Sequence, residues 1–271
     1  MLHQPFLVIA NWKMNPLTLK EARRLLANFE NGIKSLGRGN FAEKVELVVC
    51  PPSIYLHGLL RNRYCKLGIQ NIFHEDRGAY TGEIAPRMAE DAGCQYVIIG
   101  HSERRNLFGE SDELVNWKMR SALQGSLKPV LCVGENREQR DNGETTRVIA
   151  NQIKKAFSKI SVLSLSRVAI AYEPVWAISS MGKDRQSEAD DPNDIMGITI
   201  FIRKILSDLY KKDIAEKVRI LYGGSINSKN VEKIIKVETV QGILVGGASV
   251  SALEFLPILK QAYNRQDSRS Q

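Results

Sequence analysis

The sequence predicts an α/β protein of one domain, a closed (β/α)8 barrel of eight parallel strands surrounded by helices. Three observations support this prediction. The chain has 271 residues, a length at which such a barrel is routinely a single domain. Eight short runs rich in Val, Ile or Leu recur along it, with helical patterns between most of them. Hydrophobic residues make up 43% and charged residues 25% of the chain, the balance of a globular protein rather than of a disordered one.

The predicted strands are continuous apolar runs rather than alternating ones, as expected for a parallel sheet buried on both faces. They span residues 6–10, 45–50, 67–69, 96–99, 129–133, 168–172, 219–222 and 242–245. Each unit takes up about 34 residues, enough for a strand, a crossover helix and two loops. No G-x-G-x-x-G follows the first strand, and eight nearly equal units favour closure over a doubly wound sheet. No linker divides the chain, so 1–271 is predicted as one domain, with a frayed polar tail at 264–271.

Two helices carry clear signals. After the first strand, Thr18 and Glu21 have the spacing of a capping box. The apolar residues behind that box recur at steps of three and four: Ala22, Leu25, Leu26, Phe29 and Ile33. After the sixth strand, Asp191-Pro192 is typical of a cap followed by a first-turn proline. One face of the helix that follows would carry Ile195, Ile198, Ile202, Ile205, Leu206 and Leu209.

Composition excludes several classes of protein. The longest apolar runs are only a few residues long, too short to cross a bilayer, and the N-terminus lacks the features of a secretory signal. We therefore expect a cytoplasmic protein with no membrane partner. The net charge is +8, from 38 basic and 30 acidic residues. The basic residues form scattered pairs inside helical patterns rather than one block, so we expect solvated helix faces and no nucleic-acid partner.

The four cysteines indicate neither a metal site nor a disulfide framework. Cys50, Cys65, Cys94 and Cys132 are irregularly spaced, with no C-x-x-C pair and no neighbouring histidine cluster. Three of them lie in or beside apolar segments, where a free thiol behaves as a small hydrophobic group. We expect buried thiols and no metal.

The residues that follow the strands suggest an active site, because the catalytic residues of such barrels lie at the carboxyl ends of the strands. They are Asn11-Trp12-Lys13, Gln70-Asn71, Gly100-His101-Ser102-Glu103, Glu173, Gly223-Gly224-Ser225 and Gly246-Gly247-Ala248-Ser249. Taken alone, each of these residues could equally well have a structural role, as a surface charge, a helix cap or part of a turn. Together they bring a lysine, a histidine, a carboxylate and two glycine pairs to one rim. Glycine pairs after the last two strands, the second opening a helix, are typical of phosphate binding. The sequence thus predicts a small phosphorylated substrate.

Five segments resemble the signature motifs of the triosephosphate isomerase family in order, spacing and barrel position, and the resemblance covers nearly the whole chain. They are Asn11-Trp12-Lys13-Met14-Asn15, Gly100-His101-Ser102-Glu103-Arg104-Arg105, Tyr172-Glu173-Pro174-Val175-Trp176-Ala177-Ile178, Tyr222-Gly223-Gly224-Ser225 and Val245-Gly246-Gly247-Ala248-Ser249. The resemblance implies a TIM barrel that interconverts dihydroxyacetone phosphate and D-glyceraldehyde 3-phosphate in glycolysis and gluconeogenesis. It implies proton transfer through an enediolate, with no cofactor and no metal.

The resemblance also implies the roles of the site residues. Glu173 is the base that moves the carbon-bound proton, and His101, at a helix N-terminus, is the neutral electrophile, as established for this family. Lys13 is the fixed positive charge that opposes the enediolate. Asn11 orients Lys13 and the substrate. The supporting and phosphate-cradling residues are Ser102, Glu103, Gly224, Ser225, Gly246 and Gly247, of which Glu103 forms a salt bridge near Lys13.

One segment departs from the family pattern. After Trp176-Ala177-Ile178 the family usually has Gly-Thr-Gly-Lys, whereas this chain has Ser179-Ser180-Met181-Gly182-Lys183 and then an acidic stretch at 184–191. The expected lid loop, 179–191, is thus altered and roughly six residues longer. Since the lid excludes water and protects the enediolate, we expect activity with altered closure.

The loop at 72–86 predicts a homodimer. It carries Phe73, Tyr80 and Ile84 among polar residues, and loop tips seldom expose several apolar groups without a partner. Thr81-Gly82-Glu83 resembles the family loop that inserts into the neighbouring subunit near its Lys13. Glu83 is expected to pair with Arg104.

Two alternatives stay open on the sequence alone. Another phosphosugar barrel, such as a ribulose-phosphate epimerase, would need metal-binding His and Asp residues at several strand ends, which this rim lacks. The second is a catalytically impaired barrel that acts as a phosphometabolite-binding or interaction protein.

Overall fold

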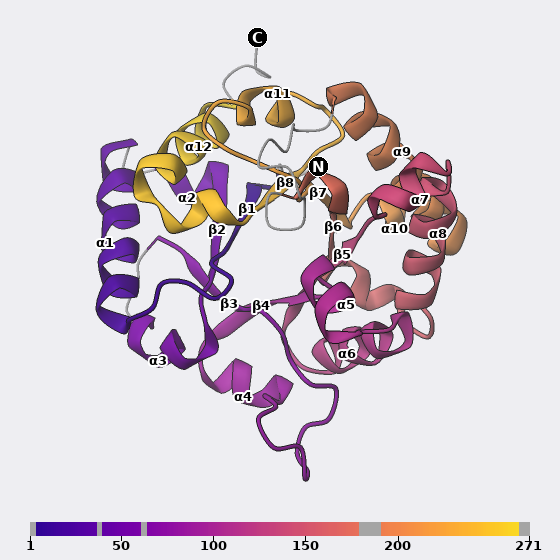
Figure 1. The fold of residues 1–271 in the computed structure, drawn as a ribbon, viewed down its shortest axis with the longest axis horizontal. Helices are drawn as coiled ribbons and strands as arrows, with labels where there is room; N and C mark the ends of the chain where they lie inside the picture. The colour runs from indigo at the N-terminus through magenta and orange to yellow at the C-terminus, as the bar shows by residue number, and fades with distance from the viewer. Residues whose placement is uncertain (1–3, 37–39, 61–63, 179–190, 266–271) are drawn as a thin grey trace.

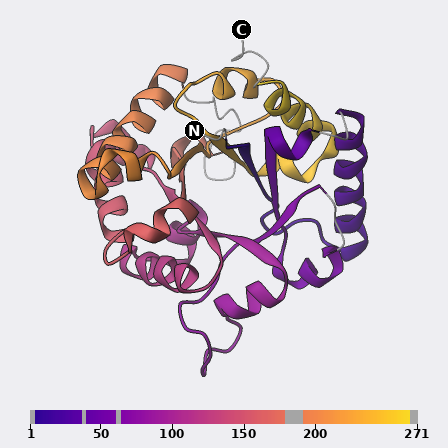
Figure 2. The same ribbon diagram turned by 180° about the vertical axis from the view of Figure 1, so that it is seen from behind.

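A computed structural model describes residues 4–36, 40–60, 64–178 and 191–265. Eight parallel strands close into a barrel in sequence order, and β1 pairs with both β2 and β8. The helices form a ring around this barrel, as Figure 1 shows from one end and Figure 2 from the other. The strands are β1 (Phe6–Asn11), β2 (Val45–Cys50), β3 (Lys66–Ile69), β4 (Cys94–Ile99), β5 (Lys128–Val133), β6 (Ala169–Tyr172), β7 (Arg219–Tyr222) and β8 (Gly242–Val245). The predicted (β/α)8 barrel is confirmed.

The helices connect successive strands on the outside of the barrel. The longer ones are α1 (Leu19–Leu36), α6 (Asp112–Gln124), α8 (Thr145–Ala156), α9 (Pro192–Tyr210) and α12 (Ala252–Asn264). The shorter ones are α2 (Phe41–Lys44), α3 (Leu56–Leu59), α4 (Pro86–Asp91), α5 (Ser102–Phe108), α7 (Arg137–Asp141), α10 (Lys212–Ala215) and α11 (Val231–Ile235). Four 3-10 turns are η1 (Ser53–Tyr55), η2 (Val162–Arg167), η3 (Val175–Ala177) and η4 (Gly247–Val250). In the part of the chain that the structure covers, no helix has the length and apolar character of a membrane span.

Two apolar layers hold the barrel together. Side chains that point inward from the strands, such as Leu7, Val48 and Ile98, fill the barrel. Those that point outward pack against the helices in a second, larger cluster that contains Phe29 and Phe255. These rings lie 4.8 Å apart between centroids and join α1 to α12. The strands are therefore buried on both faces, which is why their apolar runs do not alternate.

The predicted helix signals are present. Glu21 N donates to Thr18 Oγ1 at 3.2 Å and Thr18 N donates to Glu21 Oε2 at 3.1 Å, so the capping box begins α1. Asp191 caps α9 through a bond of 2.8 Å from Asn193 N, with Pro192 as the first helical residue.

The predicted apolar face of α9 is partly wrong. Ile198 is only half-buried and Leu209 is 41% exposed, whereas the hydroxyl-bearing Thr199 is fully buried. Thr199 Oγ1 donates to the Ile195 carbonyl oxygen four residues back at 2.9 Å, and this bond allows a hydroxyl to lie in the core.

The C-terminus is ordered slightly further than predicted. Helix α12 continues to Asn264, and the Arg265 guanidinium donates to the Val240 carbonyl oxygen at 2.7 Å. It also lies 4.6 Å from the centroid of the Phe6 ring. The rest of the predicted tail, 266–271, lies outside the described residues, as does 179–190 of the predicted lid.

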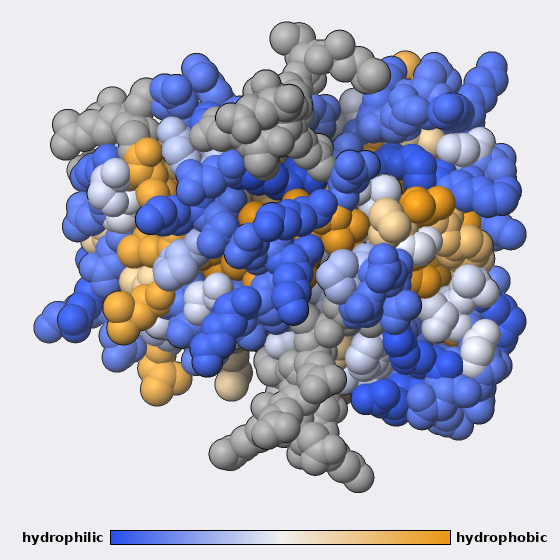
Figure 3. Space-filling view, turned by 90° about the horizontal axis from the view of Figure 1, so that it is seen from above, coloured by the Kyte–Doolittle hydropathy of each residue, from blue (hydrophilic) through white to orange (hydrophobic). Residues whose placement is uncertain are grey.

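One face of the molecule carries mainly hydrophilic side chains. Seen from above, the exposed side of the ring is mostly blue in the hydropathy colouring, with apolar patches between the polar groups (Figure 3). One segment between β3 and α4 projects beyond the ring of helices at the bottom of Figure 1. It is the predicted dimer loop.

Candidate active site

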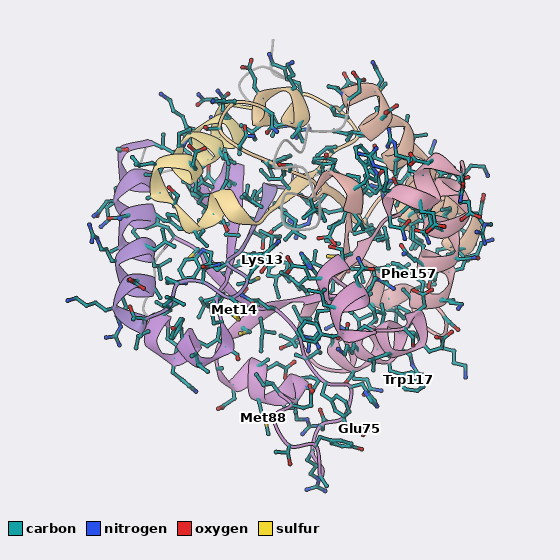
Figure 4. All side chains as sticks on the ribbon, viewed as in Figure 1. Lys13, Met14, Glu75, Met88, Trp117 and Phe157 are labelled. Atoms are coloured by element: carbon teal, nitrogen blue, oxygen red, sulfur yellow. The ribbon has the colours of Figure 1, made fainter. Side chains whose placement is uncertain are left out.

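Lys13 is held at the carboxyl end of β1 by its neighbours. Its backbone has a positive φ of 53°, an uncommon conformation for a residue other than glycine. Asn11 Oδ1 accepts from Lys13 N at 3.1 Å, and Gln70 Nε2 donates to the Lys13 carbonyl oxygen at 2.8 Å. The ammonium group lies 2.7 Å from Glu103 Oε1. Figure 4 shows Lys13 directed toward the middle of the ring.

His101 is the N-cap of α5. Its Nδ1 atom accepts a hydrogen bond of 3.2 Å from Glu103 N, the backbone donor at the second helical position. A ring nitrogen that accepts from a backbone N–H carries no proton itself, so this contact is the one expected of an imidazole whose proton lies on Nε2. His101 is buried, with 7% of its surface exposed.

Glu173 is a buried carboxylate at the end of β6, only 2% exposed. Its Oε2 atom accepts from Ser102 N at 3.0 Å, and its Oε1 atom lies 3.2 Å from His101 Nε2. The second approach lacks hydrogen-bond geometry, and Oε1 has no hydrogen-bond partner among the residues that the structure describes. One oxygen of a buried carboxylate thus remains available to accept a proton.

Two glycine turns close the other side of the site. Gly223 N donates to the Tyr172 carbonyl oxygen at 2.8 Å, which ties the turn after β7 to the strand that carries Glu173. After β8, η4 begins at Gly247, and a Cβ on Gly246 would lie 3.2 Å from Lys13 Cε. Glycine therefore allows the lysine side chain to pass close to this turn.

A single pocket brings the predicted catalytic and substrate-binding residues together. Its lining includes all eight of them: Asn11, Lys13, His101, Glu173, Gly224, Ser225, Gly246 and Gly247. A carboxyl group, an imidazole, an ammonium group and two glycine turns thus line one small space. Within the described residues, no cluster of His, Cys, Asp or Glu could hold a metal ion.

Comparison with known proteins agrees with this geometry. The family model described as triosephosphate isomerase matches residues 6–262. Triosephosphate isomerase of Dehalococcoides mccartyi strain BAV1 is 43% identical over 259 residues, which are 94% of this chain and 96% of that protein. The enzyme of Dictyoglomus thermophilum is 42% identical over 257 residues, covering 94% and 98%. That of Aquifex aeolicus is 41% identical over 256 residues, covering 93% and 98%.

The chain belongs to the triosephosphate isomerase family. It is an isomerase that interconverts triose phosphates, a step of glycolysis, and its substrate is a triose phosphate. The predictions of family, fold and reaction are therefore confirmed, and the impaired barrel that only binds a metabolite is not favoured.

Glu135 is a buried acid of this triosephosphate isomerase that was not predicted from the sequence. Glu135 is fully buried after β5 and accepts from Trp176 Nε1 at 2.9 Å and from the Tyr172 hydroxyl at 3.2 Å. Burial raises the pKa of its carboxyl group above the usual value. Trp176 itself lies under the Arg140 guanidinium, 4.0 Å from the ring centroid. Glu135 thus fixes η3, the segment that leads into the expected lid. It lies two residues after β5, and no local sequence signal marks it as buried.

Within the single chain, Arg104 pairs with a buried acid. Its Nε atom donates to Glu110, whose Oε1 atom also lies 2.5 Å from Lys118 Nζ. Burial alone would raise the pKa of the Glu110 carboxyl, but Lys118 and Arg104 hold it below the usual value. Among the described residues of the single chain, Arg104 has no ion pair with Glu83.

Proposed function

We propose that Glu173, His101 and Lys13 perform the isomerisation of dihydroxyacetone phosphate and D-glyceraldehyde 3-phosphate. The observation that supports this most directly is the open Oε1 atom of buried Glu173 in the same pocket as the His101 donor. Ser102 acts as a support, because its backbone N–H holds the other carboxylate oxygen.

The reaction is a proton shuttle between neighbouring carbons. Glu173 takes a proton from the carbon beside the carbonyl group, and the electron pair of that C–H bond forms the C=C bond of an enediolate. The carbonyl oxygen gains negative charge as its π electrons move onto it. The protonated Glu173 then returns the proton to the adjacent carbon. The hydroxyl proton of the neighbouring oxygen passes through His101 Nε2 to the former carbonyl oxygen, and the carbonyl group re-forms on the oxygen that has lost its proton.

The neighbouring groups stabilise the enediolate. The Nε2–H of neutral His101 donates to the substrate oxygens, and the Lys13 ammonium opposes their negative charge. Such preoriented groups are worth several kcal/mol in a site that excludes water. Asn11 and Glu103 position Lys13 through the contacts described above.

The phosphate group would lie against the two glycine turns. The backbone N–H groups of Gly224, Ser225, Gly246 and Gly247 are the donors that we assign to it. Phosphate suits such turns because clustered backbone N–H groups carry partial positive charge.

A coupled isomerase assay tests the assignment of the base. Glu173→Ala removes the carboxylate, and we expect kcat to fall by at least about 100-fold, the lower end of what general base catalysis supplies. Glu173→Asp keeps the carboxylate on a side chain that is shorter by one methylene. Because a misplacement of about 1 Å can lower the rate by about 100-fold, we expect kcat to fall in this variant too. Glu43→Ala, in exposed α2, is the control and should leave kcat unchanged. Full turnover in Glu173→Ala would exclude Glu173 as the base.

We also propose that the protein is a cytoplasmic homodimer in which the projecting loop docks on a second copy. Apolar side chains around this loop are exposed in the single chain: Tyr80 is 45%, Met88 56% and Trp117 49% exposed. Figure 4 places Met88 and Trp117 on the side of the ring from which the loop projects. Inside the loop, the Phe73 and Tyr80 rings pack 4.5 Å apart between centroids, which gives it a defined shape. Thr81, Glu83 and Arg104 are assigned to the contact.

Sedimentation tests the dimer. Met88→Arg introduces a charge into the proposed interface and should shift the protein toward monomer at low micromolar concentration, with loss of activity. Leu253→Arg, at an 89% exposed position on α12, adds the same charge elsewhere and should sediment as the unmodified chain. A fully active monomer at low micromolar concentration would contradict the proposal.

A further inference from the structure

The barrel contains a second polar pocket at the end opposite the active site. It has a volume of about 450 Å³ and is lined by Gln4, Pro5, Ala42, Val45, Glu46, Leu47, Tyr64, Cys65, Lys66, Lys128, Ser166 and Arg219. Lys66, Lys128 and Arg219 are the first residues of β3, β5 and β7. The pocket therefore lies at the amino ends of the strands, the end away from Lys13. We call it the amino-end pocket.

The charges that line the amino-end pocket do not balance. Three cations, Lys66, Lys128 and Arg219, face a single carboxylate, Glu46, which leaves a formal charge of +2 among the lining residues. Charge of one sign in a pocket with low-dielectric walls concentrates ions of the opposite sign. The lining thus favours an anion.

Glu46 is already fully engaged by two of the three cations. Its Oε1 atom lies 2.5 Å from Lys66 Nζ and accepts from the Tyr96 hydroxyl at 2.6 Å. Its Oε2 atom lies 2.6 Å from the Arg219 guanidinium, which also donates to the Tyr96 oxygen at 2.8 Å. This network fixes the position of the two cations, while one carboxylate cannot neutralise both.

Lys128, the third cation, forms no ion pair with Glu46. Among the residues of the described ranges, no carboxylate lies within ion-pair distance of it, and its ammonium group lies 5.3 Å from the centroid of the Tyr96 ring. Burial lowers the pKa of Lys128, and repulsion from Lys66 and Arg219 lowers it further, against attraction from Glu46. A bound anion would relieve this repulsion.

We propose that the amino-end pocket binds a small phosphate-like dianion, with Lys128 as its principal partner and Lys66 and Arg219 beside it. Two negative charges match the surplus of +2, and the volume lies in the range of about 300–1,000 Å³ typical of pockets for small ligands. Lysine and arginine are the side chains that bind phosphate oxygens through charge-assisted hydrogen bonds. This site is separate from the one that isomerises triose phosphates.

Inorganic phosphate is the probe, and two readouts separate the two sites. The first is the rise in Tm with phosphate concentration at constant ionic strength, which reports binding anywhere on the folded protein. The second is the competitive inhibition constant of phosphate in the isomerase assay, which reports the active site alone. Lys128→Met keeps the apolar stem of the side chain and breaks no ion pair, so it is expected to fold. Lys20→Met, at an exposed position near the start of α1, removes a charge at the opposite end as the control.

Lys128→Met is expected to lose at least half of the phosphate-induced rise in Tm, while its inhibition constant stays within twofold of the unmodified value. Lys20→Met should keep both values, and Lys128→Arg should restore most of the rise in Tm. If Lys128→Met retains the full rise in Tm, phosphate binds elsewhere and the proposal is wrong. It is equally wrong if the rise and the inhibition constant change together, because the active site would then account for both.

Discussion

At the residue scale, Gly134 determines where Glu173, the proposed catalytic base, can lie. A Cβ atom at this position would be only 1.8 Å from the Glu173 carbonyl oxygen, a distance that forces one of the two backbones to move. Gln152 holds Gly134 from the other side, through bonds of 2.8 Å to its N–H and 3.1 Å to its carbonyl oxygen. Gly134 therefore cannot move away, and Glu173 would have to shift.

Gly134→Ala is accordingly expected to reduce kcat by about 100-fold, the cost of a misplacement of about 1 Å. Steady-state kinetics of the folded variant measure this. Gly197→Ala is the matched control, because a Cβ there meets no atom within 4 Å, and alanine in a helix stabilises by roughly 0.5–1 kcal/mol relative to glycine. Unchanged kcat in Gly134→Ala would show that the close approach is irrelevant to the base.

The sequence predicted site residues best where a family motif surrounds them. Lys13, His101 and Glu173 each follow an apolar run within such a motif, and one pocket gathers them. Glu135 also follows an apolar run, but an acid after a strand is most often exposed. Its burial depends on Trp176, 41 residues away along the chain. Such long-range partners are not visible in local sequence patterns.

At the scale of elements, η3 links the catalytic strand β6 to the segment where the lid is expected. Val175 N donates to the Glu135 carbonyl oxygen at 3.0 Å, and the Trp176 indole donates to the Glu135 carboxylate. Hinges of lids absorb backbone changes at a few such positions. The strength of this contact is therefore expected to affect turnover.

Trp176→Phe removes the indole donor but keeps an aromatic ring. A hydrogen bond to a charged group contributes about 1.5–3 kcal/mol. We expect this bond to stabilise the enzyme with the lid closed over the reacting substrate, so its loss should lower kcat/KM by about tenfold or more. Tyr210→Phe removes a hydroxyl that donates to the Phe157 carbonyl oxygen at 3.1 Å, far from the site, and should leave kcat/KM unchanged. Equal values of kcat/KM in both variants would show that the hydrogen bond between Trp176 and Glu135 does not contribute to turnover.

Element boundaries were predicted less well than element types. The sixth strand begins at Ala169 rather than Val168, because η2 runs up to Arg167 and the Val168 N–H donates to the Leu165 carbonyl oxygen at 3.1 Å. The short helix α7 buries no residue at all, so it leaves no apolar periodicity to detect. Long helices with a buried face, such as α1, do leave that signal.

At the scale of the whole molecule, length and strand count predicted the closed barrel, but not what fills its amino end. Glu46, Tyr96 and Arg219 come from three strands that are far apart in sequence. Each lies in an otherwise apolar run, where a polar residue does not by itself indicate its partners or its role. Only barrel closure brings them together, so their shared network could not be derived from local pattern.

This network predicts how stability responds to acid. Burial alone would raise the pKa of Glu46, but Arg219, Lys66 and Tyr96 lower it from 4.5 to about 2. Because the pKa is lower in the folded state, the ionised carboxylate stabilises the fold above about pH 4.5, and this contribution is lost as the pH falls from 4.5 toward 2. The shift sets an upper bound of about 3 kcal/mol, reduced by solvent screening at the mouth of the pocket.

Glu46→Gln should therefore lower the free energy of unfolding at neutral pH, and its deficit should shrink as the pH falls from 4.5 to 2, because the unmodified protein loses its carboxylate over that range. Urea unfolding at a series of pH values, in phosphate-free buffer and at one protein concentration, measures this. Glu43→Gln, three residues earlier on exposed α2, should give a curve like that of the unmodified chain. A constant deficit between pH 4.5 and 2 would mean that ionised Glu46 contributes no stability, and that its neutral contacts alone hold the amino end together.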